Sequence, residues 1–324
     1  MSESKALKSV AALLRPVPDF PKPGILFWDI APVLRDPKAM YTIIIHTVER
    51  WRRENIDVIA GFDARGFIFG QALATALNLP FEQIRKKGKL PGNVLSQAYA
   101  LEYGEAEVEM LDDGFIAGKR VLLVDDLLAT GGTALAGAQL VERLGGTVAG
   151  LTCVTELPAL AGRSQLMHYP VYSLISVVDG KPEVDLEYCV DLLVFDRSSN
   201  DLLLIQRLNE PKGLAMPGGR IEHESLIAAG KRELVEEAGC TLDPGLSMFH
   251  SVLCEPERDP RGLKISYVLL VFTDISNARG EIGKTEVRVF PYKEGLPDRS
   301  LFVLGHGDVV HAIADINKYL CIQK

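Results

Sequence analysis

The chain has 324 residues, and 47% of them are hydrophobic, so it is long enough to form two domains with buried cores. It carries 35 basic and 43 acidic residues, and its net charge of -8 argues against a general attraction to nucleic acid or to an anionic membrane. An anionic ligand would therefore have to meet a local group of basic residues.

The cysteines and the amino terminus indicate where the protein works. The five cysteines are scattered, with no C-x-x-C pair, which is typical of a reduced intracellular protein without a disulfide framework or a zinc site. The first residues contain no apolar run long enough for a signal peptide, and no stretch of about 18 apolar residues occurs in the chain. We therefore expect a soluble, cytoplasmic protein.

The first part of the chain alternates between strand-like and helix-like segments. Short apolar runs at 57–61 and 121–124 are each followed by a turn containing glycine, as in strands buried on both faces of a parallel sheet. Helices are predicted at 66–77 and 132–144, and a further strand at 148–154. This order predicts an α/β domain with a parallel sheet.

A boundary is predicted at residues 179–183, "DGKPE", which are polar and contain Gly and Pro. Beyond it, two strand-like runs at 189–196 and 201–208 enclose the turn signal "RSSN", and a strongly helical segment follows Gly219. We therefore predict two domains, residues 1–180 and residues 184–324, the second α+β in character.

The stretch "VDDLLATGGT", residues 124–133, predicts a ligand site. Thr130 to Thr133 lie where a strand gives way to a helix, so backbone N–H groups and two hydroxyls can converge on a phosphate. Asp125 and Asp126 would repel a bare phosphate, but carboxylates accept hydrogen bonds from ribose hydroxyls. The pattern favours a ribose that bears a 5-phosphate, with a plain strand-to-helix connection as the alternative.

This stretch resembles the PRPP-binding loop of phosphoribosyltransferases, and its "LLAT" wording is similar to adenine phosphoribosyltransferases in particular. Five further segments resemble that family in the same order: 17–37, 62–70, 84–92, 99–110 and 154–163. The resemblance covers residues 13–178. It implies a phosphoribosyltransferase-type parallel sheet with flanking helices, the transfer of phosphoribosyl from PRPP to adenine, and a homodimer.

The resemblance also implies roles for individual residues. The ribose 5-phosphate would be held by Asp125, Asp126, Ala129, Thr130, Gly131, Gly132 and Thr133. The pyrophosphate group would be neutralised by Arg65, Arg85, Lys86 and Lys89. The base would be bound by Leu26, Phe27, Trp28 and Leu157, with Phe27 and Leu157 on its two faces. Two positions depart from the family near this base pocket, since relatives usually carry Arg or Lys where this chain has Trp28, and Thr or Ser where it has Ala31.

The basic segment "RKKGK" at 85–89 would on its own be a solvated loop, but beside a sugar-phosphate site it is expected to bind pyrophosphate. Residues 86–105 are expected to form a mobile lid, because the reaction passes through an oxocarbenium-like carbon that water would otherwise capture. Glu102 on this lid is the candidate for proton transfer at the purine nitrogens, with a surface role as the alternative.

The second domain contains a helix with three carboxylates on one face. Glu233, Glu236 and Glu237 fall at i, i+3 and i+4, and a like-charged i, i+4 pair opposes helix formation by a few tenths of a kcal/mol unless a cation lies between its members. The alternative is a solvent-facing acidic helix, but no Lys follows four residues after any of the three. Arg232 is expected to orient Glu236. Oxygen ligands of this kind suit Mg²⁺ or Mn²⁺.

Residues 218–240 resemble the Nudix box, and the similarity extends over residues 186–322. It implies an α/β/α sandwich and a hydrolase in which Glu236 and Glu237 are the central metal ligands, assisted by Glu233 and Glu224. The box begins one residue closer to the helix than in the common form, so Glu222 has no assigned role. The segments that flank the box look most like the ADP-ribose pyrophosphatase branch.

Two other features of the second domain are given structural interpretations. His306 and His311 are five residues apart, which is wrong for one helix face, so packing or capping is favoured over metal binding. The loop 254–264 either lines the substrate cleft or is a plain surface loop.

We therefore predict a bifunctional nucleotide-salvage enzyme. Its first domain would make AMP and pyrophosphate from adenine and PRPP, and its second would use Mg²⁺ to hydrolyse a nucleoside diphosphate derivative such as ADP-ribose. Its partners would be these small molecules, without nucleic acid or membrane. The alternatives are an active transferase whose second domain only senses a ligand, and a PRPP-sensing regulator.

Overall fold

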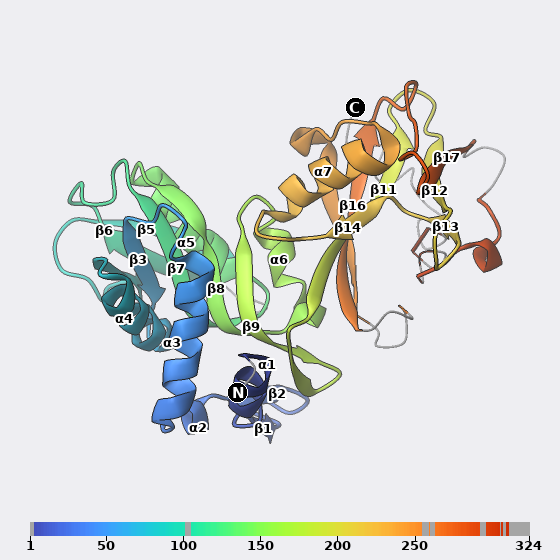
Figure 1. Ribbon diagram of the computed structural model, residues 1–324. Helices are drawn as coiled ribbons and strands as arrows, with labels where there is room; N and C mark the ends of the chain where they lie inside the picture. The colour runs from blue at the N-terminus through green and yellow to red at the C-terminus, as the bar shows by residue number, and fades with distance from the viewer. Residues whose placement is uncertain are drawn as a thin grey trace. The chain divides into compact units, whose positions relative to one another are not determined.

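The computed structural model describes residues 3–100, 105–254, 259, 263–291, 296–304, 306 and 309–310. The chain divides into two compact units, Met1–Leu186 and Glu187–Lys324, which are coloured from blue to green and from yellow to red in Figure 1. Within the described residues, no helix is long and apolar enough to cross a membrane.

An eight-stranded sheet forms the centre of the first unit, in the order β10-β9-β8-β7-β3-β4-β6-β5. Its inner strands are parallel to one another, and β5, β6 and β10 run antiparallel to their neighbours. The strands are β3 (Val58–Phe62), β4 (Phe81–Lys86), β5 (Val94–Ala100), β6 (Glu105–Leu111), β7 (Arg120–Leu128), β8 (Thr147–Glu156), β9 (Val171–Val178) and β10 (Lys181–Val184). The α/β prediction for this domain is confirmed.

Helices cover both faces of this sheet because its strands are apolar on both sides. In β7, Leu122 and Val124 belong to one core cluster, and Val121 and Leu123 belong to the other. The helices are α1 (Glu3–Ala11), α2 (Ala31–Leu34), α3 (Pro37–Trp51), α4 (Arg65–Leu77), α5 (Gly132–Arg143) and α6 (Gly162–Gln165), with a 3₁₀ turn, η1 (Pro158–Leu160). A separate two-stranded ribbon pairs β1 (Arg15–Pro18) with β2 (Leu26–Asp29).

Most of the segment 179–183, where the domain boundary was predicted, is part of the sheet. Lys181–Val184 form β10, which pairs antiparallel with β9, so that Pro182 lies opposite Val177. Glycine and proline at 180 and 182 suggested a loop, but proline is tolerated in an edge strand, where one side has no neighbour to bond. The division between the two units falls after Leu186.

A seven-stranded sheet forms the second unit, with parallel β11 and β16 at its centre. Its elements are β11 (Glu187–Asp196), β12 (Leu202–Arg207), β13 (Gly213–Ala215), β14 (Gly218–Arg220), α7 (Leu226–Ala238), η2 (Pro244–Leu246), β15 (Ser247–Leu253), β16 (Lys264–Thr273), β17 (Thr285–Phe290) and η4 (Arg299–Leu301). The Ser225 hydroxyl accepts the Ala228 N–H and caps α7, and Gly239 ends the helix in the left-handed conformation.

The two faces of this second sheet have different coverings. On one face, Gly230 of α7 lies close to Leu192 of β11 and Leu269 of β16. On the other face, Leu193, Phe195 and Leu270 form a core cluster. The alternation of side chains along β11 therefore decides which residues meet α7 and which face away from it.

Candidate functional site

The candidate residues of the first domain meet at one edge of the sheet because they follow the carboxyl ends of parallel strands. Arg65 comes after β3, Lys86 ends β4, Asp125 and Asp126 lie near the end of β7, and Leu157 follows β8. Adjacent parallel strands place their carboxyl ends together, which is where open α/β sheets bind ligands.

The loop 129–133 leads from β7 into the amino end of α5. Gly131 caps this helix with a φ of 86°, and a Cβ at this position would lie 2.5 Å from the Gly162 carbonyl oxygen. Glycine is therefore required both by the backbone conformation and by the close approach of another loop. A cavity of about 80 Å³ is bordered by Asp125, Leu151 and residues 127–134. The positive end of α5 makes this cavity suitable for an anion.

Asp126 is buried and is paired with the guanidinium of Arg65, the first residue of α4. Its Oδ2 lies 3.0 Å from Nε of Arg65, and its backbone N–H donates to Asp125 Oδ1 at 2.8 Å. Burial raises the pKa of Asp126, although Arg65 opposes the shift. Burial and the neighbouring charge of Asp126 raise the pKa of Asp125 well above its usual range. These carboxylates are therefore held in an environment that disfavours their charge.

Arg65 also connects this pair to the expected base site. Its guanidinium carbon lies 5.7 Å from the centre of the Phe27 ring, which packs edge-on against Phe20. Leu26 is 41% exposed, and Trp28 is buried in the core. Because side chains alternate along β2, Phe27 faces away from Leu26 and Trp28, so the three side chains do not line one surface.

The remaining predicted residues of this domain are placed as follows. Leu157 donates its N–H to Leu128 O at 2.9 Å, and Arg85 lies 3.4 Å from Asp63 Oδ2. Lys86 and Lys89 are exposed. Within the expected lid, residues 86–105, strand β5 pairs antiparallel with β6. Glu102, the candidate for proton transfer, lies outside the described residues.

In the second domain, α7 presents its carboxylates to a guanidinium group. Arg232 forms an ion pair with Glu233 and lies 2.7 Å from Glu224, whereas its distance to Glu236 is 3.8 Å. Arg232 therefore contacts Glu236 as expected, but only at this longer distance, and its hydrogen bonds go to Glu224, Glu233 and the Arg220 carbonyl oxygen. Glu236 is left with a side chain 55% exposed.

The other two carboxylates of α7 touch the strand β14. Glu237 Oε2 accepts the N–H of Gly218 at 2.8 Å, and the carboxylate of Glu233 occupies the space that a side chain at Gly219 would need. Burial, together with the charge of Glu233, raises the pKa of Glu237 to about 7. Burial also raises the pKa of Glu233, although Arg232 opposes it.

Whether these residues fit a divalent cation depends on their chemistry and their spacing. In the part of the chain that the structure describes, no three acidic, histidine or cysteine side chains converge closely enough to hold a metal. The donors are nevertheless carboxylate oxygens of the kind that Mg²⁺ prefers, and the raised pKa values of Glu233 and Glu237 mark a place where a cation would be stabilising. The donor set therefore fits Mg²⁺, with Arg232 supplying positive charge to Glu224 and Glu233.

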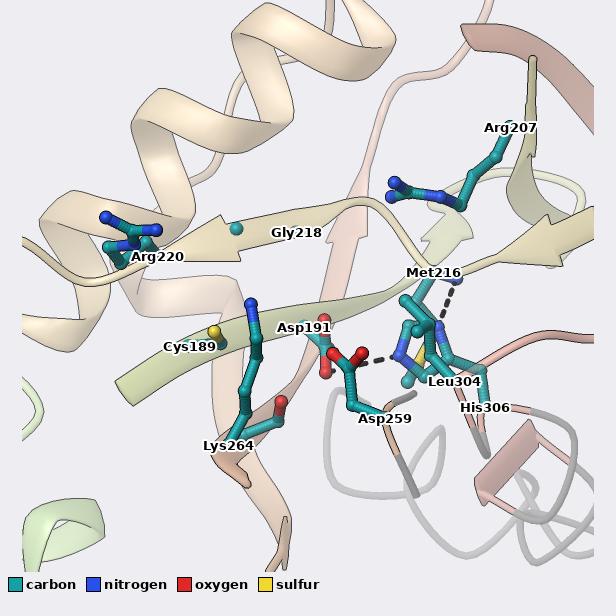
Figure 2. A pocket seen from close by; sticks show the side chains of 12 residues that line it. Cys189, Asp191, Arg207, Met216, Gly218, Arg220, Asp259, Lys264, Leu304 and His306 are labelled. Carbon is teal, nitrogen blue, oxygen red and sulfur yellow. Dashed lines mark hydrogen bonds and ion pairs between the residues drawn. The ribbon is translucent and has the colours of Figure 1, made fainter. Parts of the chain in front are cut away.

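A polar pocket of about 180 Å³ lies beside β14, lined in part by Gly218 and Gly219. Strand pairing brings three of its lining residues together, because Cys189 of β11 lies opposite Arg220 of β14 on one side and opposite Ser266 of β16 on the other. Figure 2 shows β14 between α7 and the side chains of Asp191, Asp259 and His306. Its basic residues are Arg207, Arg220 and Lys264. The pocket therefore offers both cations and carboxylates to a ligand.

His306 and Asp191 form a buried pair in this pocket that the sequence interpretation did not include. The imidazole Nε2 lies 3.3 Å from Asp191 Oδ2, and Nδ1 accepts the Met216 N–H at 3.0 Å. The hydrogen bond from Met216 and the contact with Asp191 thus hold His306 in the protein interior. His311 lies outside the described residues. A carboxylate inside the apolar run "VDLLVF" was the available signal, since a buried charge requires a partner. In the loop 254–264, Asp259 is buried and lines the pocket.

Two family models match the chain. The phosphoribosyl transferase domain matches residues 34–181, and the NUDIX domain matches residues 186–310. The adenine phosphoribosyltransferase of Sorangium cellulosum is 50% identical over 181 residues, which cover 54% of this chain and 90% of that protein. The enzyme of the same name from Koribacter versatilis is 48% identical over 167 residues, which cover 52% of this chain and 92% of that protein.

Solved structures give the same result for the first domain. The crystal structure of adenine phosphoribosyltransferase from Thermoanaerobacter pseudethanolicus has a TM-score of 0.51 and 47% identity, covering 52% of this chain and 99% of that one. The structure of the enzyme from Rhodothermus marinus has a TM-score of 0.51 and 44% identity, and the match covers 53% of this chain and 98% of that one. Each of these relatives covers about half of this chain, so the character of the second half rests on the NUDIX match.

Proposed function

This chain belongs to the adenine phosphoribosyltransferase family and carries a NUDIX domain, and we propose that it is a bifunctional enzyme of nucleotide salvage. The first domain transfers phosphoribosyl from PRPP to adenine, giving AMP and pyrophosphate. The second hydrolyses a nucleoside diphosphate derivative such as ADP-ribose with the help of Mg²⁺. The two domains would serve one purpose, because AMP is a product of both reactions.

The cavity where Asp125 meets the loop 129–133 carries the proposal for the first activity. A ribose 5-phosphate placed there has its phosphate at the amino end of α5 and its hydroxyls near the carboxylates. A purine nitrogen forms the new bond at C1′ as the bond to pyrophosphate breaks, and the leaving pyrophosphate takes the bonding electrons. The proton of the purine imidazole ring passes to a base, for which Glu102 is the candidate. Arg65, 3.0 Å from Asp126 and close to Phe27, lies between the expected base and ribose positions.

The first activity is tested by incubating the full chain with adenine, PRPP and Mg²⁺ and measuring AMP and pyrophosphate. Equal concentrations of hypoxanthine and guanine test the preference for adenine, which the unusual Trp28 and Ala31 make worth measuring. We expect AMP in excess over the other nucleotides, and much less of it from the Asp126→Asn variant. Failure to form a nucleotide from any of the three purines would refute this part of the proposal.

The carboxylates of α7 and the pocket beside β14 carry the proposal for the second activity. A bound Mg²⁺ would neutralise diphosphate oxygens and assist the deprotonation of an attacking water. Glu236 and Glu237 would hold it, with Glu233 and Glu224 assisting. The cations Arg207, Arg220 and Lys264 would attract the phosphates of the substrate into the pocket.

The second activity is tested with a panel of ADP-ribose, NADH, diadenosine polyphosphates, nucleoside triphosphates and PRPP. We expect cleavage of ADP-ribose to AMP and ribose 5-phosphate, with loss of this activity in Glu236→Gln. If adenine and PRPP give AMP but no compound of the panel is cleaved, the second domain is a ligand sensor. A homodimer in the cytoplasm also belongs to the proposal, and a light-scattering mass equal to one chain would contradict the dimer.

A further inference from the structure

The basic turn after β4 is folded around a buried carboxylate. Glu109 of β6 is 2% exposed, and its Oε2 accepts the Gly88 N–H at 2.9 Å. Its Oε1 accepts the N–H groups of Lys89 and Leu90, each at 2.8 Å. Consecutive backbone N–H groups that converge in this way form an anion-binding concavity. Here the anion is supplied by the protein itself.

Strand register explains how a residue so far along the chain reaches this turn. β4 and β6 pair antiparallel with Arg85 opposite Glu109, and the Lys87 N–H donates to Glu107 O at 3.2 Å. Gly88 adopts a φ of 78°, which allows the chain to turn back over β6. Burial acts to raise the pKa of Glu109, but hydrogen bonds from the three backbone N–H groups hold this pKa below its usual value.

The turn held by Glu109 carries the side chains expected to meet pyrophosphate. Lys86 and Lys89 are exposed beside it, and Arg85 donates from Nη1 to the carbonyl oxygen of Lys89 at 3.1 Å. Arg85 also reaches Asp63 Oδ2 at 3.4 Å, two residues before Arg65. The backbone position of Lys89 therefore links Glu109 to Arg85 and to the edge of the sheet where the site lies.

We propose that Glu109 is a positioning residue for pyrophosphate binding: its carboxylate fixes the turn 87–90 so that Arg85, Lys86 and Lys89 face the pyrophosphate group of PRPP. This inference rests on the proposed function of the first domain. Glu109 itself does not touch the substrate, because its oxygens are occupied by backbone donors.

A carboxylate is needed at this position because all its partners are donors. Glutamine would offer one acceptor oxygen, and its NH₂ group would point at backbone N–H groups. Glu109→Gln therefore keeps the size of the side chain but removes the anion around which the turn is folded. Glu107→Gln is the matched control, because Glu107 lies on the same strand and its ion pair with Lys87, at 2.8 Å, is on the surface.

The experiment measures initial rates of AMP formation by the full chain against PRPP at saturating adenine, and against adenine at saturating PRPP. We expect Glu109→Gln to raise the KM for PRPP by about tenfold or more, the effect expected when a group that supports a binding residue is lost. The KM for adenine should stay near that of the wild type, and inhibition by inorganic pyrophosphate should weaken by the same factor as PRPP binding. Glu107→Gln should leave both constants unchanged.

Other outcomes would overturn the inference. An unchanged KM for PRPP in Glu109→Gln, or an equal rise in both KM values, would mean that the carboxylate only stabilises the fold. If Glu109→Gln does not fold, Glu109→Asp takes its place, because a shorter carboxylate keeps both acceptors but displaces the turn. An Asp variant with normal PRPP and pyrophosphate binding would then contradict the proposal.

The proposed function can fail independently of this inference. If the wild type forms no AMP from adenine and PRPP, that function is refuted. Calorimetric binding of inorganic pyrophosphate to the wild type and to Glu109→Gln still measures what the carboxylate does for the turn. Equal affinities would overturn the inference, and weaker binding to the variant would support it.

Discussion

His306 bridges Asp191 and the backbone N–H of Met216 in the second domain, as Figure 2 shows by its dashed lines. Nδ1 accepts the Met216 N–H, and Nε2 on the other side of the ring faces Asp191 Oδ2 at 3.3 Å. Met216 is followed by Pro217 and by the glycines whose other contacts are Glu237 and Glu233. The histidine thus fixes one end of the turn that supports the carboxylates of α7.

His306→Ala is expected to destabilise the second domain by roughly 3 kcal/mol, the cost of breaking a buried pair. Both tryptophans, Trp28 and Trp51, lie in the first domain, so tryptophan fluorescence reports on that domain alone. During urea unfolding, the circular dichroism transition of the second domain should move to lower urea, and the fluorescence transition should not. His223→Ala is the control, since His223 is exposed. Equal shifts in both transitions would contradict the assignment.

Glu236→Gln is expected to separate hydrolysis from stability. The side chain of Glu236 is 55% exposed and its contact with Arg232 is long, at 3.8 Å, so its replacement should change the free energy of unfolding by less than about 0.5 kcal/mol. If Glu236 helps to hold Mg²⁺, the rate of ADP-ribose cleavage should fall by on the order of a hundredfold, as when one stabiliser of transition-state charge is removed. The test compares rates across a Mg²⁺ titration with those of Glu286→Gln, another exposed glutamate. An unchanged rate and Mg²⁺ dependence would remove Glu236 from the metal site.

Asp196 is expected to make the second domain less stable in acid. Burial acts to raise its pKa, but hydrogen bonds from Ser198, Ser199 and Ile275 hold it well below the usual value of 3.8. A lowered folded-state pKa stabilises the protein above the unfolded value, and this contribution is lost as pH falls through the folded value. Asp196→Asn should therefore cost about 2 kcal/mol near neutral pH, with a difference from the wild type that shrinks below about pH 4. The test measures the urea midpoints of the wild type and of Asp196→Asn across this pH range. A stability difference that does not change with pH would contradict the charge-based account.

The residues that sequence reasoning placed and those it missed differ in the range of their contacts. Apolar periodicity located α4 and α5 to within a residue or so, because a buried helix face is a local pattern. The contacts of Glu109 and His306 were missed because their partners, Gly88 and Met216, are 21 and 90 residues away. Only strand pairing brings such residues together. A buried acidic residue in a strand, such as Asp191 or Glu109, is the signal that could have indicated them.

Asp125→Asn is expected to stabilise the first domain while weakening its activity. The pKa of Asp125 is raised, first by burial and then by the charge of Asp126, so its ionised form is unfavourable in the absence of ligand. A carboxyl with a raised folded-state pKa lowers stability fully above that pKa, and the penalty is relieved as pH falls toward the unfolded value. An uncharged side chain of the same size should therefore raise the free energy of unfolding by roughly 1 to 2 kcal/mol at about pH 8, and by less at about pH 5.

Tryptophan fluorescence during urea unfolding measures this change in the first domain, and initial rates against PRPP measure its functional cost. The KM for PRPP should rise, because an amide is a weaker acceptor than a carboxylate for ribose hydroxyls and its NH₂ group cannot accept at all. The Asp126 N–H can still donate to the remaining amide oxygen, so the loop should keep its fold. A variant that is less stable than the wild type at every pH would contradict this account. It would show that Asp125 stabilises the fold, and that its ionised carboxylate does not lower the stability of the ligand-free domain.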